Sequence, residues 1–512
     1  MKCTRVLAAA AVFLLLSALS LQAGEECTTV VVAGKATRDG RPLLWKNRDV
    51  EDVQNEAVYI TGGLYSLVGI APPESTAAIL MGVNSAGLAI ENSVSYDLEG
   101  ESGEDNGVFM KLVLQTCASV ADFERLLRET NAGGRRTKAN FGVIDATGAA
   151  AIFETGNHTF AKYDANDPAT APAGFVVRTN FGFTGDGSGG GYERYERALE
   201  LIGNGVAAGE MGHAYLLRRV ARDLRNDLVD PYPLPYEGSQ EGHPAGYIRT
   251  NYSISRYFTR SCVVVHGVRP GEDPRLSTMW TILGEPACGV AVPLWVHAGG
   301  TPPETDGSLT APFCDAIFEK KSACYTDPSG LSLANQYLNT YALDEGTGGG
   351  ILTFSLPIED WALARAEEAL GSWRMNFPSQ EAVLATENDI VYQAYCLFLA
   401  STVPTGIPAP ADLVGQRVLN RALLLQEYVD ILTWSPRPGS PPVDGYAISA
   451  IENGRKVLLG RVSSSTTRFW HRDVQGTGRY QYAVAAVDRE GREGNPACVI
   501  VEGASQRSGS RR

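Results

Sequence analysis

From Cys27 to about residue 400, strand-like and helix-like runs follow one another closely. Apolar and β-branched spacing predicts strands at 28–33, 42–45, 81–90, 140–144 and 149–154. Amphipathic spacing predicts helices at 107–117, 120–130, 192–202, 361–375 and 387–400. Because strands grouped around blocks of helices are typical of layered domains, the pattern predicts an α+β fold for this part of the chain.

The first two predicted strands form a hairpin around the Asp39-Gly40 pair. A turn centred between these two residues pairs Cys27 with a residue near position 52, and each residue of register shift is worth roughly 3.3 Å. The segment 46–49, Lys-Asn-Arg-Asp, is therefore expected to return close to Cys27. A carboxylate there would hold an ammonium group and a cation would favour a thiolate, although the tetrapeptide taken alone is more typical of a polar strand exit.

The C-terminal part has a different pattern. A proline-rich stretch, 403–415, is predicted to link the catalytic domain, 27–402, to an all-β module at 416–505 that is followed by a basic tail at 506–512. Trp434 and the alternating residues of 480–484 resemble a fibronectin type III module, an immunoglobulin-like sandwich whose usual role is spacing or binding. Its ligand, such as a surface or polysaccharide, is left open.

The N-terminal residues predict export. Lys2 and Arg5 precede the apolar run 6–19 and a small residue at Ala23, which together indicate a signal peptide at 1–23. The run is shorter than the roughly 20 residues of a membrane span, so no membrane insertion is expected. Residues 24–26 would form a short propeptide, and the mature protein is expected to be secreted, either periplasmic or extracellular.

Composition bounds the remaining possibilities. The chain has 512 residues, enough for two or three domains, and a net charge of −14 that argues against a nucleic-acid partner. The six histidines form no H-E-x-x-H motif and the cysteines no C-x-x-C motif, so neither a metal nor a cofactor is expected. Cys314 and Cys324 are spaced to close a short loop, but the sequence fixes no disulfide pairing and no oligomeric state.

Cys27 is the candidate catalytic residue. As the first residue of a mature chain it would carry both a thiol nucleophile and an α-amino base. Their ordinary pKa values, about 8.5 and about 8, are close, so proton transfer between them costs only about 1 kcal/mol. The alternative is a structural cysteine that pairs in a disulfide, and a free, alkylatable Cys27 would favour the enzyme.

An ordered set of motifs resembles N-terminal-nucleophile hydrolases, nearest to penicillin V acylase, choloylglycine hydrolase and isopenicillin-N acyltransferases. The set spreads over residues 27 to about 300, and its members are Cys27-Thr28-Thr29, Asp39-Gly40-Arg41, Asn47-x-Asp49, Gly82-x-Asn84-x-x-Gly87-Leu88-Ala89-Ile90, Arg178-Thr179-Asn180 and Ser253-x-Ser255-Arg256-Tyr257-x-x-Arg260. The resemblance implies a four-layer αββα sandwich.

The resemblance also implies roles for individual residues. Cys27 would be the nucleophile and, through its amine, the general base, with Asp49 orienting that amine. Asn180 would contribute its side chain to the oxyanion hole, with Asn92 as a second contributor.

Other positions follow the family pattern less closely. Arg256, with Arg260 as the fallback, would match the arginine near the nucleophile. Bile-salt hydrolases have arginine where this chain has Lys46, which leaves the role of that cation open. Glu26 precedes Cys27, so the Gly-Cys processing junction of the acyltransferases is absent.

The sequence thus predicts a secreted, autoprocessed hydrolase or acyltransferase that cleaves a linear carbon–nitrogen amide bond of a small molecule through a thioester on Cys27. One alternative is a dipeptidase of the same superfamily, whose members also begin Cys-Thr-Thr. Another is a secreted binding or adhesion protein with a structural Cys27. The acyl group and the leaving amine are not specified by the sequence.

Overall fold

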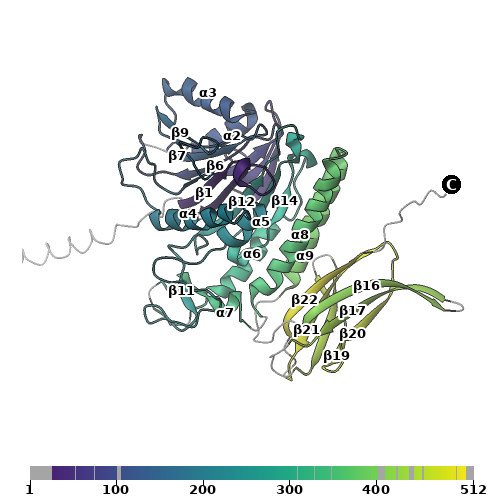
Figure 1. The fold of residues 1–512 in the computed structure, drawn as a ribbon. Helices are drawn as coiled ribbons and strands as arrows, with labels where there is room; N and C mark the ends of the chain where they lie inside the picture. Colours follow the sequence, from purple (N-terminus) through teal and green to yellow (C-terminus); the bar gives the residue numbers. More distant parts are fainter. Residues whose placement is uncertain are drawn as a thin grey trace, which may run out of the picture.

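The computed structural model describes residues 26–51, 54–73, 75–100, 105–307, 310–327, 329–331, 333–346, 349–401, 410–422, 425–437, 443–452, 455–489, 491 and 493–502. The predicted signal peptide and basic tail lie outside these residues, as do most of the propeptide and of the linker. Figure 1 shows a large mixed domain and, beside the ends of its long helices, a small β-sandwich.

Two antiparallel sheets form the centre of the large domain. The first has the order β10-β1-β2-β12-β13-β14, with bounds Phe175–Arg178, Glu26–Val32, Leu43–Asp49, Thr259–His266, Thr278–Ile282 and Val292–Leu294. The second runs in chain order, with β3 Glu56–Ile60, β4 Leu67–Ala71, β5 Met81–Asn84, β6 Ala89–Val94, β7 Ala139–Ile144, β8 Ala150–Thr155 and β9 Phe160–Asp164. β1 is therefore an interior strand of its sheet.

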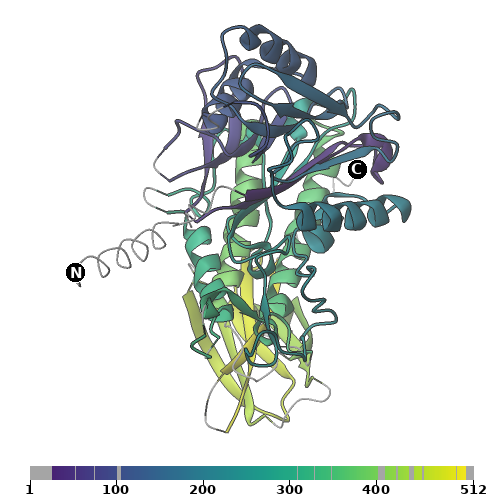
Figure 2. The same cartoon turned by 90° about the vertical axis from the view of Figure 1, so that its left-hand side faces the viewer.

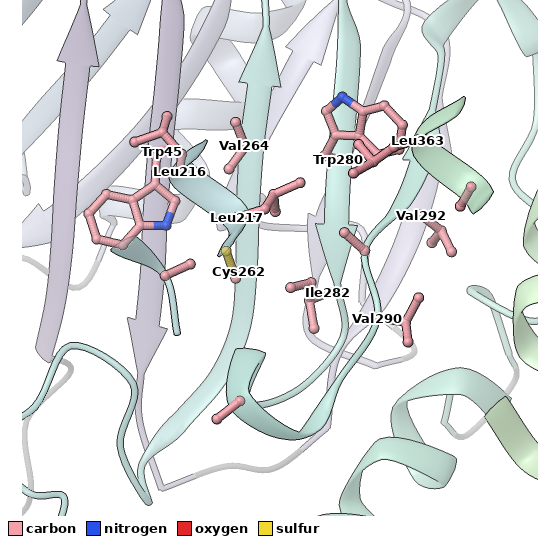
Figure 3. Packing of buried hydrophobic residues seen from close by; sticks show 14 of the residues in the cluster. Trp45, Leu216, Leu217, Cys262, Val264, Trp280, Ile282, Val290, Val292 and Leu363 are labelled. Atoms are coloured by element: carbon pink, nitrogen blue, oxygen red, sulfur yellow. The ribbon is translucent and has the colours of Figure 1, made fainter. Parts of the chain in front are cut away.

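Three buried apolar layers hold the sheets and helices together. Alternate residues of β1 and β2, such as Val31 and Leu44, pack against the second sheet, because successive side chains of a strand point to opposite faces. The outer face of the second sheet is covered by α2, Asn106–Thr116, and α3, Val120–Asn131. Side chains of β2, β12 and β13 on the outer face of the first sheet pack against residues such as Leu216 (Figure 3).

The helices on that outer face complete the fourth layer. They include α4, Tyr192–Ala207, α8, Ile351–Trp373, and α9, Gln380–Ala400. Figure 2, turned by 90°, shows the two sheets stacked with helices on both outer sides. The αββα architecture is thus confirmed.

Short elements connect these layers, and the remaining bounds are η1 Gly34–Ala36, α5 His213–Tyr215, η2 Leu216–Val220, β11 Tyr247–Arg249, η3 Pro274–Leu276, η4 Pro286–Cys288, η5 Val296–Ala298, α6 Pro312–Cys324, η6 Ala334–Gln336, β15 Tyr337–Asn339 and α7 Thr340–Leu343. Across the described residues, no helix is long and apolar enough to span a bilayer.

Two strand predictions need correction. Cys27 pairs with Arg48 and not with a residue near 52, because η1 lies between the strands and moves the centre of the hairpin towards its first strand. The predicted strand 81–90 is two strands, β5 and β6, joined by a turn in which Gly87 has a φ of +79°. Residues 46–49 nevertheless return beside Cys27, as expected.

No disulfide joins any two of the eight cysteines in the described part of the chain. Cys314 and Cys324 both lie on α6. Ten residues of α-helix separate their Cα atoms by about 15 Å, which is far beyond the reach of a disulfide. The short loop suggested by their spacing therefore does not form.

The C-terminal module is a sandwich of two sheets, β16-β17-β20 and β19-β18-β21-β22. Their bounds are β16 Ala411–Ala422, β17 Leu425–Ser435, β18 Gly445–Glu452, β19 Arg455–Ser463, β20 Arg468–Val474, β21 Arg479–Val487 and β22 Glu493–Glu502. β16 begins inside the predicted linker, and the sequence did not predict β20 or β22. Trp434, Tyr446 and Tyr482 fill the core between the sheets, so the predicted all-β sandwich is confirmed.

Replacing Trp434 with alanine should destabilise the module by about 3–5 kcal/mol, because the indole ring is 4% exposed and lies 5.3 Å from the ring of Tyr446. The matched control is Trp470→Ala in β20, where 51% exposure limits the expected loss to about 0.5 kcal/mol. Urea unfolding followed by circular dichroism measures both values, and equal losses would contradict this packing.

Candidate active site

Cys27 lies at the start of the interior strand β1 and is fully buried. Its backbone N–H donates a hydrogen bond to Oδ1 of Asn180, at 3.1 Å. Asn180 comes two residues after the neighbouring strand β10 and forms a bridge with Gly190, which fixes the glycine-rich segment 185–191 beside it. Sheet pairing thus brings the nitrogen of the predicted nucleophile to the predicted asparagine.

A buried ion-pair network surrounds this position. Asp49, at the end of β2, accepts hydrogen bonds from Nε of Arg256, at 2.8 Å, and from Oγ1 of Thr259, at 2.7 Å. Glu26 faces Asp49 in the strand ladder, and its Oε2 accepts from Nη2 of Arg256 at 2.6 Å. The predicted residues Asp49 and Arg256 therefore contact each other, and Arg256 also contacts the side chain of the residue before Cys27.

Arg194 is a site residue that the sequence analysis missed. Its Nη1 donates to the carbonyl oxygen of Cys27, at 2.7 Å, and to Oγ1 of Thr28, at 2.9 Å. Its Nη2 donates to Oε2 of Glu26, at 3.0 Å, and to Oδ1 of Asn180, at 2.9 Å. A buried arginine so placed orients both β1 and the side chain of Asn180.

The position of Arg194 on its helix could have revealed it. Arg194, Ala198 and Ile202 follow one another at four-residue spacing in α4, and all three are buried. Such spacing marks the stripe of a helix that faces the core, and a charged residue on that stripe requires a buried partner.

The network balances two guanidinium groups against two carboxylates. Burial alone would raise the pKa of Glu26, but the charges of Arg256 and Arg194 lower it below its ordinary value. Burial and the nearby Arg256 lower the pKa of Arg194. Burial alone would lower the pKa of Arg256 as well, but the charges of Asp49 and Glu26 raise it above its ordinary value. Each charge is therefore held in place by its partners.

The ion-pair network borders a cavity of about 480 Å³. Its lining includes the four charged residues just described together with Val50, Gly191, Glu193, Asn251, Tyr252 and Phe258. This cavity is large enough for a small molecule, and Glu26, the residue before Cys27, lies in its wall.

The other predicted residues have different surroundings. Nζ of Lys46 donates to Oδ1 of Asn92, at 2.9 Å, and to the carbonyl oxygen of Leu80, at 3.2 Å. Nδ2 of Asn92 is buried and has no hydrogen-bond partner among the described residues. Arg260, the fallback, donates to the carbonyl oxygens of residues 50, 51 and 257, whereas Arg256 contacts the network.

Glu91 forms a hydrogen bond with Thr29 of β1 and is close enough to Lys46 to feel its charge. Oε1 of Glu91 accepts a hydrogen bond from Oγ1 of Thr29, two residues after Cys27, at 2.5 Å. Burial raises the pKa of Glu91 to about 8, although the charge of Lys46 works in the opposite direction. The carboxyl group of Glu91 is therefore mostly protonated at neutral pH.

Residues 36–181 match the family model of acyl-coenzyme A:6-aminopenicillanic acid acyl-transferase. No curated protein sequence matches the chain. Penicillin V acylase from Agrobacterium tumefaciens is similar in structure, with 14% identity, a TM-score of 0.32 and coverage of 52% of this chain and 86% of that chain. A variant of conjugated bile acid hydrolase from Clostridium perfringens has 13% identity, a TM-score of 0.31 and coverage of 50% and 88%.

The C-terminal module is similar to an Fn3-like protein from Clostridium thermocellum, with 21% identity, a TM-score of 0.16 and coverage of 20% of this chain and 97% of that chain. These identities and TM-scores are too low to transfer the role of any residue. The family match includes Asp49, Asn92 and Asn180, but neither Cys27 nor Arg256.

The family match and the four-layer fold together confirm the resemblance predicted from the motifs. Residues 36–181 of the large domain are similar to this acyltransferase family.

Replacing Glu91 with glutamine should flatten the pH dependence of stability. Between pH about 4.5 and about 8 the folded chain keeps a proton on Glu91 that the unfolded chain releases, so stability falls as pH rises through this window. The slope is at most about 1.4 kcal/mol per pH unit, and Glu91→Gln removes it. Urea unfolding across the window measures the slope.

The matched control for this variant is Glu129→Gln, a change at a side chain that is 63% exposed on α3. It should retain the slope of the unchanged protein. If Glu91→Gln and Glu129→Gln gave the same slope, a protonated Glu91 would be contradicted.

Proposed function

We propose that the protein is an exported, self-processing amide hydrolase whose nucleophile is Cys27 at the N-terminus of the mature chain. One observation carries the proposal. Oδ1 of Asn180 accepts from the N–H of Cys27, Arg194 donates to the carbonyl oxygen of Cys27 and to the carboxylate of Glu26, and Arg256, paired with Asp49, donates to the same carboxylate. A structural cysteine in a disulfide would need no such set of polar groups around its backbone and the residue before it.

Cleavage between Glu26 and Cys27 would change the electrostatics of the site. It removes the Glu26 carboxylate and creates an α-amine at the nitrogen that Asn180 already accepts from. Arg194 and Arg256 then have one carboxylate, Asp49, between them. Excess positive charge disfavours an ammonium and favours a thiolate, so it lowers the pKa values of both groups on Cys27.

The first chemical step is attack by the thiolate of Cys27 on the carbonyl carbon of the substrate amide. The C–N bond then breaks, the leaving amine takes a proton from the α-ammonium of Cys27, and a thioester remains. Water, deprotonated by the free α-amine, adds to the thioester and releases the acid and the thiol. The buried Nδ2 of Asn92 and the side chain of Asn180 are the proposed donors to the oxyanion.

The same acyl-enzyme can react with an amine in place of water. The match of residues 36–181 to an acyltransferase model supports transfer as the second candidate activity. The position that Glu26 vacates, between two guanidinium groups, favours a small amide with an anionic group near the scissile bond. The C-terminal module would hold the exported enzyme on a surface or polysaccharide.

The direct test compares Cys27→Ser with Cys498→Ser in the full-length protein, using N-acyl amino acids, penicillin V and acyl-coenzyme A with an amine acceptor. Both substitutions replace a thiol with a hydroxyl, and Cys498 lies in β22 of the distant module. We expect Cys27→Ser to lose amide cleavage and transfer, and Cys498→Ser to retain them. Cleavage of these substrates by Cys27→Ser at the unchanged rate would refute Cys27 as the nucleophile.

Asn180→Ala should lower turnover by about 10²–10³, with a smaller change in substrate binding, because the variant lacks both the proposed oxyanion donor and the acceptor for the nitrogen of Cys27. Steady-state kinetics on a cleaved amide give kcat and KM separately. Asn166→Ala, at an exposed position, serves as the control and should leave both constants unchanged. Unchanged turnover in Asn180→Ala would exclude Asn180 from the mechanism.

A further inference from the structure

A second cluster of reactive side chains lies at the opposite end of the central sheet. His213 in α5, His266 at the end of β12 and Glu367 in α8 each present a ligand atom, and these atoms all lie within 4.8 Å of one another. His266 pairs with Leu43 at the start of β2, whereas Asp49 of the proposed catalytic site is at the other end of that strand. The two sites are therefore about 20 Å apart along β2.

The histidine rings are held in place by packing. The ring of His213 stacks on Trp280, with centroids 5.4 Å apart and an interplanar angle of 3°. The ring of His266 packs against that of His213, with centroids 4.5 Å apart. Both histidines are buried, so their positions are defined before any ligand binds.

His213 has an unused hydrogen-bonding capacity. Within the described residues neither of its ring nitrogens forms a hydrogen bond, and its nearest polar contact is from Nε2 to Oε1 of Glu367, at 3.6 Å. A ligand bound to a ring nitrogen of His213 would therefore displace no hydrogen bond that the described residues make.

The surroundings also contain the groups that orient metal ligands. Nε2 of His266 lies 2.8 Å from Oδ2 of Asp39, and a carboxylate on one ring nitrogen fixes the orientation of a metal-binding histidine. Nη1 of Arg374 lies 3.8 Å from Oε2 of Glu367, which leaves Oε1 facing His213. The separation of 3.6 Å between Nε2 of His213 and Oε1 of Glu367 suits two ligands on one ion with bonds of about 2.0–2.2 Å.

We propose that His213, His266 and Glu367 bind one divalent transition-metal ion of the zinc class. Two imidazoles and a carboxylate are the donors that zinc and cobalt accept, and water would complete a tetrahedral set. The ion links α8 and α5 to the end of the central sheet. Its role is structural, because the ligands are distant from Cys27, and the site does not depend on the proposed amide chemistry.

The test is titration of the full-length, metal-stripped protein with Co²⁺, followed by visible absorption, and with Zn²⁺, followed by calorimetry and thermal unfolding. We expect one ion per chain, the visible bands of tetrahedral Co²⁺, and a higher Tm with Zn²⁺. Failure of the protein to bind either ion at one equivalent would overturn the proposal.

Matched variants locate the ion. Glu367→Gln should weaken binding at least tenfold, whereas Glu368→Gln at the next position, 73% exposed, should bind like the unchanged protein. His213→Ala should also weaken binding at least tenfold, with His297→Ala as its control. Glu367 is 41% exposed, so its variant tests the site even if His213→Ala fails to fold. Unchanged affinity in Glu367→Gln, with or without a folded His213→Ala, would refute the assignment.

Discussion

In the uncleaved chain the geometry around Cys27 depends on ion pairs that join Arg194 and Arg256 to the buried Asp49 and the partly exposed Glu26. Asp49 would remain the shared partner of both arginines after the proposed loss of Glu26, and removing a buried partner of this kind costs several kcal/mol. The network therefore holds the start of β1, the end of β2 and the first turn of α4 in one arrangement. Cys27 has its position because these three segments meet beside it.

The register of β1 is a second constraint. Val31 and Leu44 face the second sheet, while Val30 and Trp45 face the helices, so a shift of one residue would expose each set to the wrong layer. The apolar layers thus fix the alternation that places Cys27 opposite Arg48. Core packing and the ion-pair network therefore favour the same register of β1, and this register fixes the backbone position of Cys27.

Local patterns in the sequence predicted some elements but not others. The helix expected at 120–130 is α3, which begins after Ser119, whereas β12, β13 and β14 were not predicted. The hairpin register was wrong because η1 lengthens one side of the connection, which a turn motif does not indicate. Local patterns are sufficient for some elements, but the pairing between them depends on the loops.

The site residues that lie in sequence motifs were predicted, and those brought in only by packing were not. Asp49, Asn180 and Arg256 carry motifs, so the sequence identified them, and the structure brings all three to the peptide around Cys27. Arg194 belongs to no motif and becomes a site residue only when α4 packs on β1. The histidine cluster was invisible for the same reason, because its ligands come from three distant segments and no short spacing joins them.

The central claim is that residues before Cys27 are removed and that the chain performs this step itself. The measurement is the intact mass and N-terminal sequence of the exported protein, compared with those of Cys27→Ala. The account predicts that the unchanged protein begins at Cys27, while the variant retains Glu26 and the residues that precede it. An unchanged protein that still carries Glu26 would have no free α-amine on Cys27 and would contradict the account.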